Sequence, residues 1–315
     1  MRKKILITPR SFGSIAKEPF EMLKDYEILK NETGHPLNEN ELKELIKDVD
    51  GVIVGIDKLT KDVLNKAEKL KVITKYGVGL DNIDVDYAKK LGIKITYTPG
   101  ANKDSVADLV FALMLGLSRD LLKLDSTVRN NKWNKIIGTE VYGKTIGIIG
   151  TGNIGKCVAK RAKGFDMNIL AYDINKDYKY AEEIGMKYVD LETLLKESDY
   201  ITLHIPLTSD MHHLIDEKEL DMMKPTAYII NTSRGEIINE EALYKALKEK
   251  RIAGAALDVY EVEPPVNNKF LQLENVILSP HCGASTKDAI FRMSMMAVEG
   301  LKSVLENKKP KYLYE

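Results

Sequence analysis

The chain has 315 residues, which suggests about two domains, and its hydrophobic content of 44% is enough for two cores. Lys+Arg and Asp+Glu both number 47, so the formal net charge is zero and neither nucleic acid nor an anionic membrane is an indicated partner. No apolar run approaches the ~18 residues of a membrane span, and the first run is too short for a signal peptide. Two cysteines provide neither a disulfide framework nor a metal cluster. We expect a cytoplasmic protein without a metal site.

The first 100 residues alternate short apolar runs with amphipathic stretches, which indicates strands and helices in turn. Strands are expected over residues 4–8, 26–30, 51–55, 70–75 and 93–97, with helices over 17–25, 38–47, 60–67 and 85–90. The repeat predicts a small parallel α/β domain.

A Pro-Gly pair at residues 99–100 marks the end of this first domain. A long helical segment is expected over residues 105–129, and its first part, 106–117, is apolar nearly all round, so that part should be buried. The alternation then resumes: strands are expected over residues 145–149, 167–172, 200–205, 227–232, 254–259 and 276–278, and helices over 156–163, 191–197, 217–222, 240–248 and 286–305. The whole chain is therefore predicted to be α/β with parallel sheets.

The stretch around residues 144–173 reads strand, glycine loop, helix, strand, acid. Gly150 allows a tight turn, Gly152 lets backbone approach a pyrophosphate, and Gly155 lets the helix pack close to the sheet. The helix N-terminus favours phosphate. Asp173 follows the second strand, where its carboxylate can accept hydrogen bonds from ribose hydroxyls and repel a 2′-phosphate. The pattern predicts a dinucleotide site that prefers NAD, although Lys176 leaves some room for NADP.

Polar side chains follow the later strands, at the edge where ligands bind in parallel sheets. Arg234 follows the strand at 227–232, Glu261 and Glu263 follow the next one, and His281 follows the last. Arginine, glutamate and histidine are what hydride transfer to a 2-oxo acid requires, since the cofactor carries the electrons while the protein binds the carboxylate and moves the proton. The residues alone leave open which glutamate acts, and whether the histidine is structural.

Five motifs together resemble the D-isomer-specific 2-hydroxyacid dehydrogenases, and within them the D-3-phosphoglycerate dehydrogenase branch. They are Tyr-Gly-Val-Gly-Leu-Asp-Asn-Ile-Asp at 76–84, Gly-Thr-Gly-Asn-Ile-Gly at 150–155, Asn-Thr-Ser-Arg-Gly at 231–235, Ala-Leu-Asp-Val-Tyr-Glu-Val-Glu-Pro-Pro at 256–265 and Ser-Pro-His-Cys-Gly-Ala-Ser-Thr at 279–286. The resemblance implies two Rossmann-like, doubly wound parallel-sheet domains with the active site in the cleft between them. It places the substrate domain at 1–100 plus 287–315 and the NAD-binding domain at 101–286.

The resemblance also assigns roles. Arg234 would hold the substrate carboxylate, His281 would be the acid/base and Glu263 would bond its other ring nitrogen. Further substrate contacts would come from the backbone of Val78 and Gly79 and from Arg10. The cofactor would contact Gly150, Gly152, Asn153, Ile154, Gly155, Asp173, Pro206, Thr232, Asp258 and Gly283. Cys282 is expected to be a small buried hydrophobe rather than a nucleophile.

The predicted reaction is NAD-dependent hydride transfer for a D-2-hydroxy acid/2-oxo acid pair, taken as D-3-phosphoglycerate/3-phosphohydroxypyruvate. Phosphoglycerate dehydrogenases usually carry a base after the third strand; here only Lys58 is near, and Arg10 is a possible replacement. The alternative is a hydroxypyruvate or glyoxylate reductase acting on unphosphorylated acids. A non-enzymatic alternative is an NAD-sensing, corepressor-like binding module. The resemblance and the apolar segment 106–117 predict a homodimer formed through the NAD-binding domain.

Overall fold

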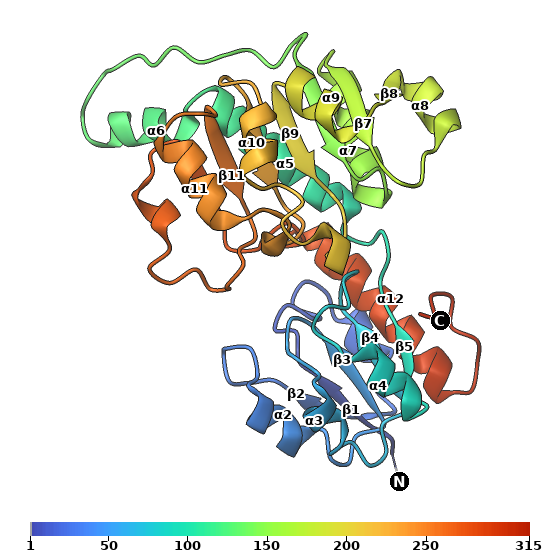
Figure 1. Ribbon diagram of the computed structural model, residues 1–315. Helices are drawn as coiled ribbons and strands as arrows, with labels where there is room; N and C mark the ends of the chain where they lie inside the picture. Colours follow the sequence, from blue (N-terminus) through green and yellow to red (C-terminus); the bar gives the residue numbers. More distant parts are fainter. Residues whose placement is uncertain (1) are drawn as a thin grey trace. The chain divides into compact units, whose positions relative to one another are not determined.

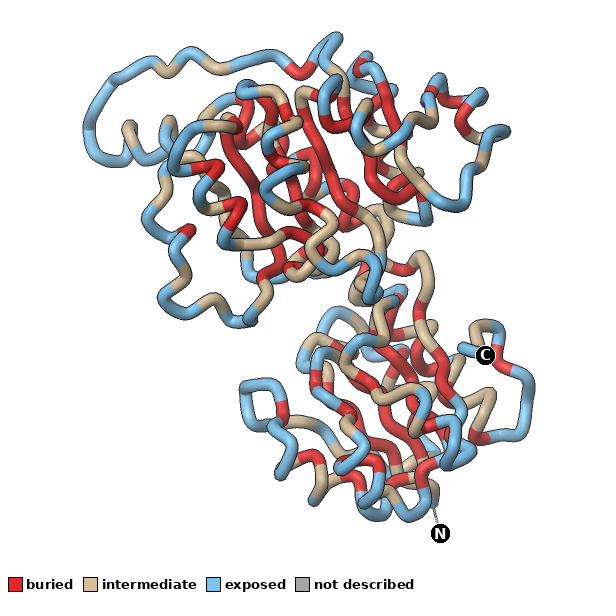
Figure 2. Tube along the Cα trace, viewed as in Figure 1, coloured by how far each residue is buried: buried red, intermediate tan, exposed pale blue. Residues whose placement is uncertain are grey.

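The computed structural model describes residues 2–315, which divide into two compact units: Met1–Asn102 with Ala284–Glu315, and Lys103–Gly283. We call these unit 1 and unit 2. Figure 1 traces both along the sequence, and Figure 2 shows that buried residues concentrate in the strands of each.

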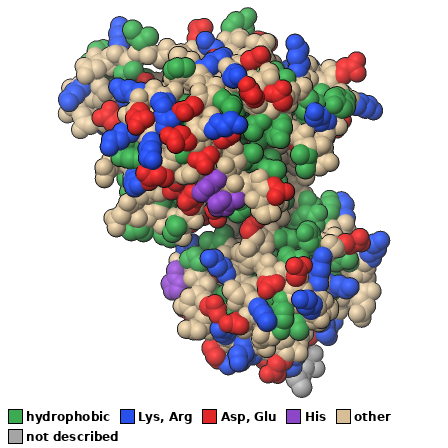
Figure 3. Space-filling view, viewed as in Figure 1, with side chains coloured by type: hydrophobic (Ala, Val, Ile, Leu, Met, Phe, Trp, Pro, Cys, Tyr) green, Lys and Arg blue, Asp and Glu red, His purple; other side chains and the backbone are tan. Residues whose placement is uncertain are grey.

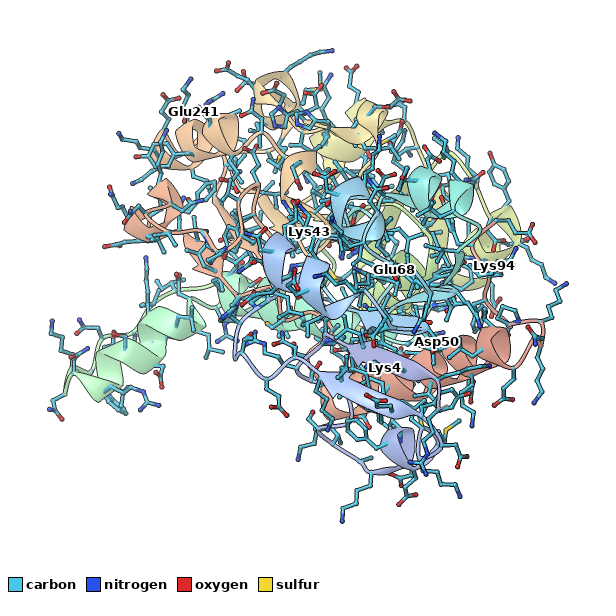
Figure 4. The ribbon with its side chains drawn as sticks, turned by 90° about the horizontal axis from the view of Figure 1, so that it is seen from below. Lys4, Lys43, Asp50, Glu68, Lys94 and Glu241 are labelled. Atoms are coloured by element: carbon cyan, nitrogen blue, oxygen red, sulfur yellow. The ribbon has the colours of Figure 1, made fainter. Side chains whose placement is uncertain are left out.

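Unit 1 contains one parallel sheet of five strands in the order β2-β1-β3-β4-β5. Its strands are β1 (Lys4–Ile7), β2 (Glu27–Lys30), β3 (Gly51–Val54), β4 (Val72–Lys75) and β5 (Lys94–Thr96). Its helices are α1 (Glu18–Glu21), α2 (Glu39–Leu45), α3 (Lys61–Leu64), α4 (Val85–Lys90) and α12 (Lys287–Leu305). At the amino ends of the strands, the Lys4 backbone N donates to Asp50 Oδ2 at 2.9 Å, and Figure 4 labels both residues. The sheet and its helices enclose two apolar clusters, one of which includes α12.

Unit 2 contains one parallel sheet of seven strands in the order β12-β11-β10-β9-β6-β7-β8. Its strands are β6 (Thr145–Ile149), β7 (Asn168–Tyr172), β8 (Met186–Tyr188), β9 (Tyr200–Leu203), β10 (Tyr228–Asn231), β11 (Gly254–Leu257) and β12 (Val276–Leu278). Its α-helices are α5 (Lys103–Ser118), α6 (Leu121–Arg129), α7 (Asn153–Gly164), α8 (Tyr178–Ile184), α9 (Leu191–Glu197), α10 (Glu217–Met222) and α11 (Glu240–Lys248), and its 3-10 turns are η1 (Ser209–Met211), η2 (Gly235–Ile237) and η3 (Lys269–Gln272).

The strand order of unit 2 reverses direction between β6 and β9, which are hydrogen-bonded neighbours. One half of the sheet runs outward through β7 to β8 and the other through β10 and β11 to β12. In doubly wound sheets, ligands bind beyond the carboxyl ends of the strands at such a switch point. The two-sheet, all-parallel α/β fold class expected from the sequence is confirmed.

The long helical segment predicted over residues 105–129 is helical along nearly its whole length, but it is divided into two helices, α5 and α6. The chain turns at Asp120, which adopts the left-handed backbone region with φ of 50°, and α6 begins at the next residue. Neither Gly nor Pro marks this break, so the sequence carried no signal for it. As predicted, most of segment 106–117 is buried, because α5 packs against α7 and against strands β10 to β12.

Candidate active site

The glycine loop leaves β6 directly at the switch point of unit 2. Gly150 has φ of +93°, and a Cβ built on it would lie 2.6 Å from the His204 carbonyl oxygen. A Cβ on Gly155 would lie 2.0 Å from the Gly150 carbonyl oxygen. Both positions therefore require glycine, the first for its backbone conformation and the second for the close approach of α7 to the loop.

The start of α7 is open to an anionic ligand. Its N-cap, Gly152, supplies no side-chain hydrogen bond, and a Cβ there would meet nothing within 4 Å. The backbone N–H groups of the first turn, from Asn153 onward, therefore have no capping side chain, and the helix dipole favours negative charge beside them. Nearby strand ends carry two buried polar atoms without a protein partner, Thr232 Oγ1 and His204 Nδ1. Uncapped amides and orphaned polar atoms around one switch point fit a bound dinucleotide.

Asp173, the acid after β7, is held by the loop itself. Its Oδ2 accepts from the Thr151 backbone N at 2.6 Å and from Thr151 Oγ1 at 2.9 Å. Its Oδ1 accepts from the Asn175 backbone N at 2.8 Å, while Thr151 Oγ1 also lies 2.8 Å from Tyr188 Oη. Thr151 thus joins the glycine loop to the acid, a role that the sequence analysis did not assign.

Arg234 stands at the turn between β10 and η2. Asn231, the last residue of β10, donates from Nδ2 to the Arg234 carbonyl at 2.7 Å, and its Oδ1 accepts from the Ser233 backbone N at 3.0 Å. A Cβ on Gly235 would lie 1.9 Å from the Tyr260 carbonyl carbon, so η2 packs directly on the segment after β11. Asn231 thereby fixes the backbone that presents Arg234, another role missed from sequence although its motif was recognised.

His281 and Glu263 are brought together from two different strand ends. His281 Nδ1 lies 2.8 Å from Glu263 Oε2, and their side chains are 42% and 34% exposed. Burial alone would raise the pKa of Glu263, but the hydrogen bond and charge of His281, the Tyr260 N–H and the charge of Arg234 outweigh it, so the pKa is lowered. An ionised carboxylate only accepts hydrogen bonds, so Nδ1 carries the proton and Nε2 is the ring nitrogen left for a ligand.

Asp258 holds the backbone around His281. Its side chain is buried, and its oxygens accept from Ser279 Oγ at 2.6 Å and from the backbone N of Cys282 and Gly283, both at 2.8 Å. The Asp258 carbonyl accepts from the His281 backbone N at 2.8 Å. His281 has φ of 50°, a left-handed conformation that is uncommon outside glycine and that these bonds stabilise. The predicted contact of Asp258 with the cofactor remains a prediction.

The Cys282 thiol next to His281 is not activated. Burial raises its pKa, and the nearby charge of Asp258 raises it further, so the neutral thiol is favoured.

The remaining predicted substrate residues lie in unit 1. Val78 is 41% exposed in the loop after β4, next to Gly79. Arg10, in the loop after β1, donates from Nη1 to the Gly34 carbonyl. Of the other predicted cofactor contacts, Pro206 follows β9, and the Gly283 carbonyl accepts from Ser105 Oγ at 2.6 Å.

Residues 111–283 match the family described as D-isomer specific 2-hydroxyacid dehydrogenase, NAD binding domain. The chain belongs to the D-isomer-specific 2-hydroxyacid dehydrogenase family. A glyoxylate reductase from Thermococcus litoralis is 43% identical over 320 residues, which cover 98% of this chain and 96% of the relative. A hydroxypyruvate reductase from Thermotoga maritima is 44% identical and covers 90% of this chain and 93% of its own. A D-3-phosphoglycerate dehydrogenase from Methanocaldococcus jannaschii is 43% identical, but the match covers 97% of this chain and only 58% of that one.

The solved structures agree with this membership. D-lactate dehydrogenase from Aquifex aeolicus, complexed with NAD and lactic acid, superposes with a TM-score of 0.83 at 33% identity, covering 96% of both chains. The chain is an NAD-dependent 2-hydroxyacid dehydrogenase. Within residues 2–315, every helix is too short or too polar to cross a bilayer. The cytoplasmic location stays a prediction.

Proposed function

We propose that this dehydrogenase uses NADH to reduce a short, unphosphorylated 2-oxo acid, glyoxylate or hydroxypyruvate, to the D-2-hydroxy acid. The names of the Thermococcus and Thermotoga relatives support this choice. The observation that carries it is the polar cluster at the carboxyl ends of β1, β3 and β4 in unit 1.

This cluster occupies the place where a phosphate-binding base would follow β3. Gly55 stands there, and its carbonyl accepts from Lys75 Nζ at 2.6 Å and from Asn82 Nδ2 at 3.0 Å. Lys75 Nζ also donates to Asn82 Oδ1 at 2.5 Å. Asp57 is buried two residues beyond Gly55, and it accepts from the Leu37 backbone N at 2.7 Å and from the Thr8 hydroxyl.

Lys75 is the cation of this cluster, but it is buried and its Nζ donates to the Gly55 carbonyl and to Asn82 Oδ1, so the cluster favours an unphosphorylated substrate. The buried side chain after β3 is an acid, which repels a phosphate dianion. Lys58 is exposed, and the Arg10 guanidinium donates to the Gly34 carbonyl. The alternative substrate pair, D-3-phosphoglycerate and 3-phosphohydroxypyruvate, takes its support from the sequence motifs and the Methanocaldococcus relative.

The residues of unit 2 would act as follows. Arg234 binds the planar carboxylate of the oxo acid through its guanidinium fork. Protonated His281 donates from Nε2 to the carbonyl oxygen at C2, and Glu263 stabilises the imidazolium from Nδ1. NADH, when bound, would supply the hydride for C2. Uncapped α7 amides would hold the cofactor phosphates, and Asp173 the ribose hydroxyls. In the overall reaction, the 2-oxo acid, NADH and a proton would give the 2-hydroxy acid and NAD⁺.

The test is NADH oxidation, followed by absorbance, with glyoxylate, hydroxypyruvate, pyruvate and 3-phosphohydroxypyruvate in parallel. We expect kcat/KM for glyoxylate or hydroxypyruvate to exceed that for the phosphorylated acid by at least about tenfold, equivalent to ~1.4 kcal/mol. His281→Ala is the control and should remove turnover while keeping NADH binding. A preference for 3-phosphohydroxypyruvate would overturn the proposal.

We also propose a homodimer formed through unit 2, but not through the segment predicted from sequence. Most of segment 106–117 is buried inside unit 2 and is unavailable. Helix α6 instead buries no residue, and Leu121 and Leu122 on it are 57% and 59% exposed. Trp133 and Ile137, in the stretch after it, are 84% and 97% exposed, and Figure 2 shows this whole stretch as largely exposed.

A nine-residue helix that buries none of its residues is marginal in water, so α6 needs a covering surface. A second copy is the proposed partner, because a chain of zero net charge does not repel itself. Sedimentation at micromolar concentration should show a dimer, and Leu122→Glu with Ile137→Asp should dissociate it. A wild-type species of only 35.5 kDa would refute the proposal.

A further inference from the structure

The segment after β11 carries two glutamates, and each is bonded to a histidine from another part of unit 2. Glu263 Oε2 lies 2.8 Å from His281 Nδ1. Glu261 Oε1 lies 3.0 Å from His213 Nε2, and both of these side chains are about one-third exposed, at 33% and 30%. Figure 3 shows histidine side chains bordered by acidic side chains at the surface of unit 2. The proposed reaction uses only one of these pairs, so the other needs an explanation.

Glu261 is an anchor point between the segment and its surroundings. Its backbone N donates to Glu240 Oε1 at 2.9 Å, and the Glu240 backbone N donates back to Glu261 Oε1 at 3.2 Å. Glu240 is the first residue of α11, so this exchange ties the segment to that helix. The same Oε1 accepts from His213, which ties it to the chain between β9 and α10. Glu261 therefore fixes the segment from two sides.

Glu263 depends on its neighbours for its position. Val262, the residue between the two glutamates, is 74% exposed and packs against little. On the other side, Tyr260 is buried, its Oη donates to the Ser279 carbonyl at 3.1 Å, and its backbone N donates to Glu263 Oε1 at 3.2 Å. The short span from Tyr260 to Glu263 is thus held by Tyr260 and by Glu261, and loss of either anchor lets the carboxylate shift from His281.

His213 is built to reach Glu261. Its backbone adopts φ of 53°, a conformation that histidine and asparagine tolerate better than most residues. The His213 backbone N donates to the Glu236 carbonyl at 2.8 Å, and its ring centroid lies 3.9 Å from that of His212. These contacts direct the His213 side chain onto the Glu261 carboxylate. Because a carboxylate only accepts hydrogen bonds, His213 Nε2 is the donor.

We infer that His213 and Glu261 form a second histidine–glutamate pair that positions Glu263, and through it the ring of His281. The inference rests on the proposed reductase reaction, in which His281 moves the proton. His213 is then a positioning residue: it touches neither substrate nor cofactor, and its hydrogen bond selects the place of the carboxylate that fixes the His281 tautomer. A shift of about 1 Å at a reacting group costs on the order of 10²-fold in rate, so such an anchor matters.

The experiment compares two substitutions that differ by one methylene group. His213→Asn keeps a residue that tolerates the left-handed backbone but is too short to reach Glu261. His213→Gln is long enough to donate to it. We expect His213→Asn to lower kcat by about 10- to 100-fold, with the dissociation constant of NADH unchanged, and His213→Gln to recover most of the loss. His35→Asn, which removes an exposed histidine of unit 1, is the control and should retain activity.

A second measurement does not require turnover. Nitrogen-15 NMR of labelled histidine, with five histidines in the chain, reports the tautomer of the neutral His281 ring. The wild type and His213→Gln should show the proton on Nδ1, whereas His213→Asn should shift the population toward Nε2. An unchanged tautomer in His213→Asn would overturn the inference whatever kcat does, as would loss of NADH binding. If the wild type reduces none of the acids, the proposed function fails, but the tautomer still decides the inference.

Discussion

His204 is a buried histidine that unit 2 holds neutral, and its replacement should change how the free energy of unfolding depends on pH. The ring follows β9 at the switch point, with Nε2 2.9 Å from Thr202 Oγ1 and with Nδ1 buried without a protein partner. Desolvation by burial lowers its pKa from 6.5 to about 3. As pH falls below 6.5, His204 therefore takes up a proton in the unfolded chain but stays neutral in the folded chain, and the folded state loses stability.

The size of the effect follows from this shift. Between about pH 8 and pH 5, protonation of an unfolded histidine with a pKa of 6.5 stabilises the unfolded state by about 2 kcal/mol, while folded His204 stays neutral. His204→Asn cannot titrate, so it should lack this contribution. The difference in free energy of unfolding between wild type and variant should therefore move by about 2 kcal/mol across that range, in the direction that makes the wild type lose more at low pH.

The assay is urea unfolding of the cofactor-free protein, followed by circular dichroism at both pH values. His35→Asn removes an exposed histidine and is the control for the loss of an imidazole. A wild-type minus variant difference that does not change with pH would show that His204 takes up its proton in the folded state, and the reasoning from burial would be refuted.

Three further substitutions probe the site. Glu263→Gln should lower kcat by about 10²–10⁴-fold, because the carboxylate that accepts from His281 Nδ1 is gone; full activity would contradict the assigned role. Asp173→Asn should weaken NADH binding by about tenfold and bring the dissociation constants of NADH and NADPH closer together, as measured by fluorescence titration of both; an unchanged ratio of the two constants would count against the ribose contact. Asp258→Asn leaves one accepting oxygen where the aspartate has two, so Tm should fall by the equivalent of about 1–3 kcal/mol and kcat should fall with it. Unchanged values in calorimetry and kinetics would show that Asp258 does not hold the backbone around His281.

The parallel sheets were predictable from sequence because their strands are continuous β-branched runs. Thr145–Ile149 and Gly51–Val54 are examples, buried along nearly their whole length. Met186–Tyr188 was missed because Lys187 interrupts it and none of its three residues is β-branched, whereas the equally short Val276–Leu278 is a continuous apolar run. The turn at Asp120 was missed because left-handed backbone at a residue other than glycine leaves no mark in composition.

The candidate site divides along similar lines. The glycine loop and Asp173 could be predicted because their physics is local: a turn, a helix end and an acid at a fixed spacing. The histidine–glutamate pair of His281 and Glu263 came only with the family resemblance. His213 and Glu261 are 48 residues apart, and nothing in either neighbourhood indicates the other. This contact depends on how the ends of β9, β10 and β11 lie next to one another, and that arrangement cannot be predicted from a single sequence.

Unit 1 is built from two segments that are separated in the chain by the whole of unit 2, and this order affects how the protein folds during synthesis. Unit 2 is complete once residue 283 has emerged, whereas unit 1 still lacks Ala284–Glu315. Helix α12 is part of the apolar cluster that covers β1, β3 and β4, where its residues Met293, Ala297, Val298, Leu301 and Leu305 pack with Ile5, Ile53 and Val72. At about 5–20 residues per second, translation leaves that side of the first sheet without its helix for as long as the 181 residues of unit 2 take to be made. The sheet of unit 1 is thus made before unit 2 and covered after it, and a nascent chain stalled before α12 presents an apolar surface to chaperones.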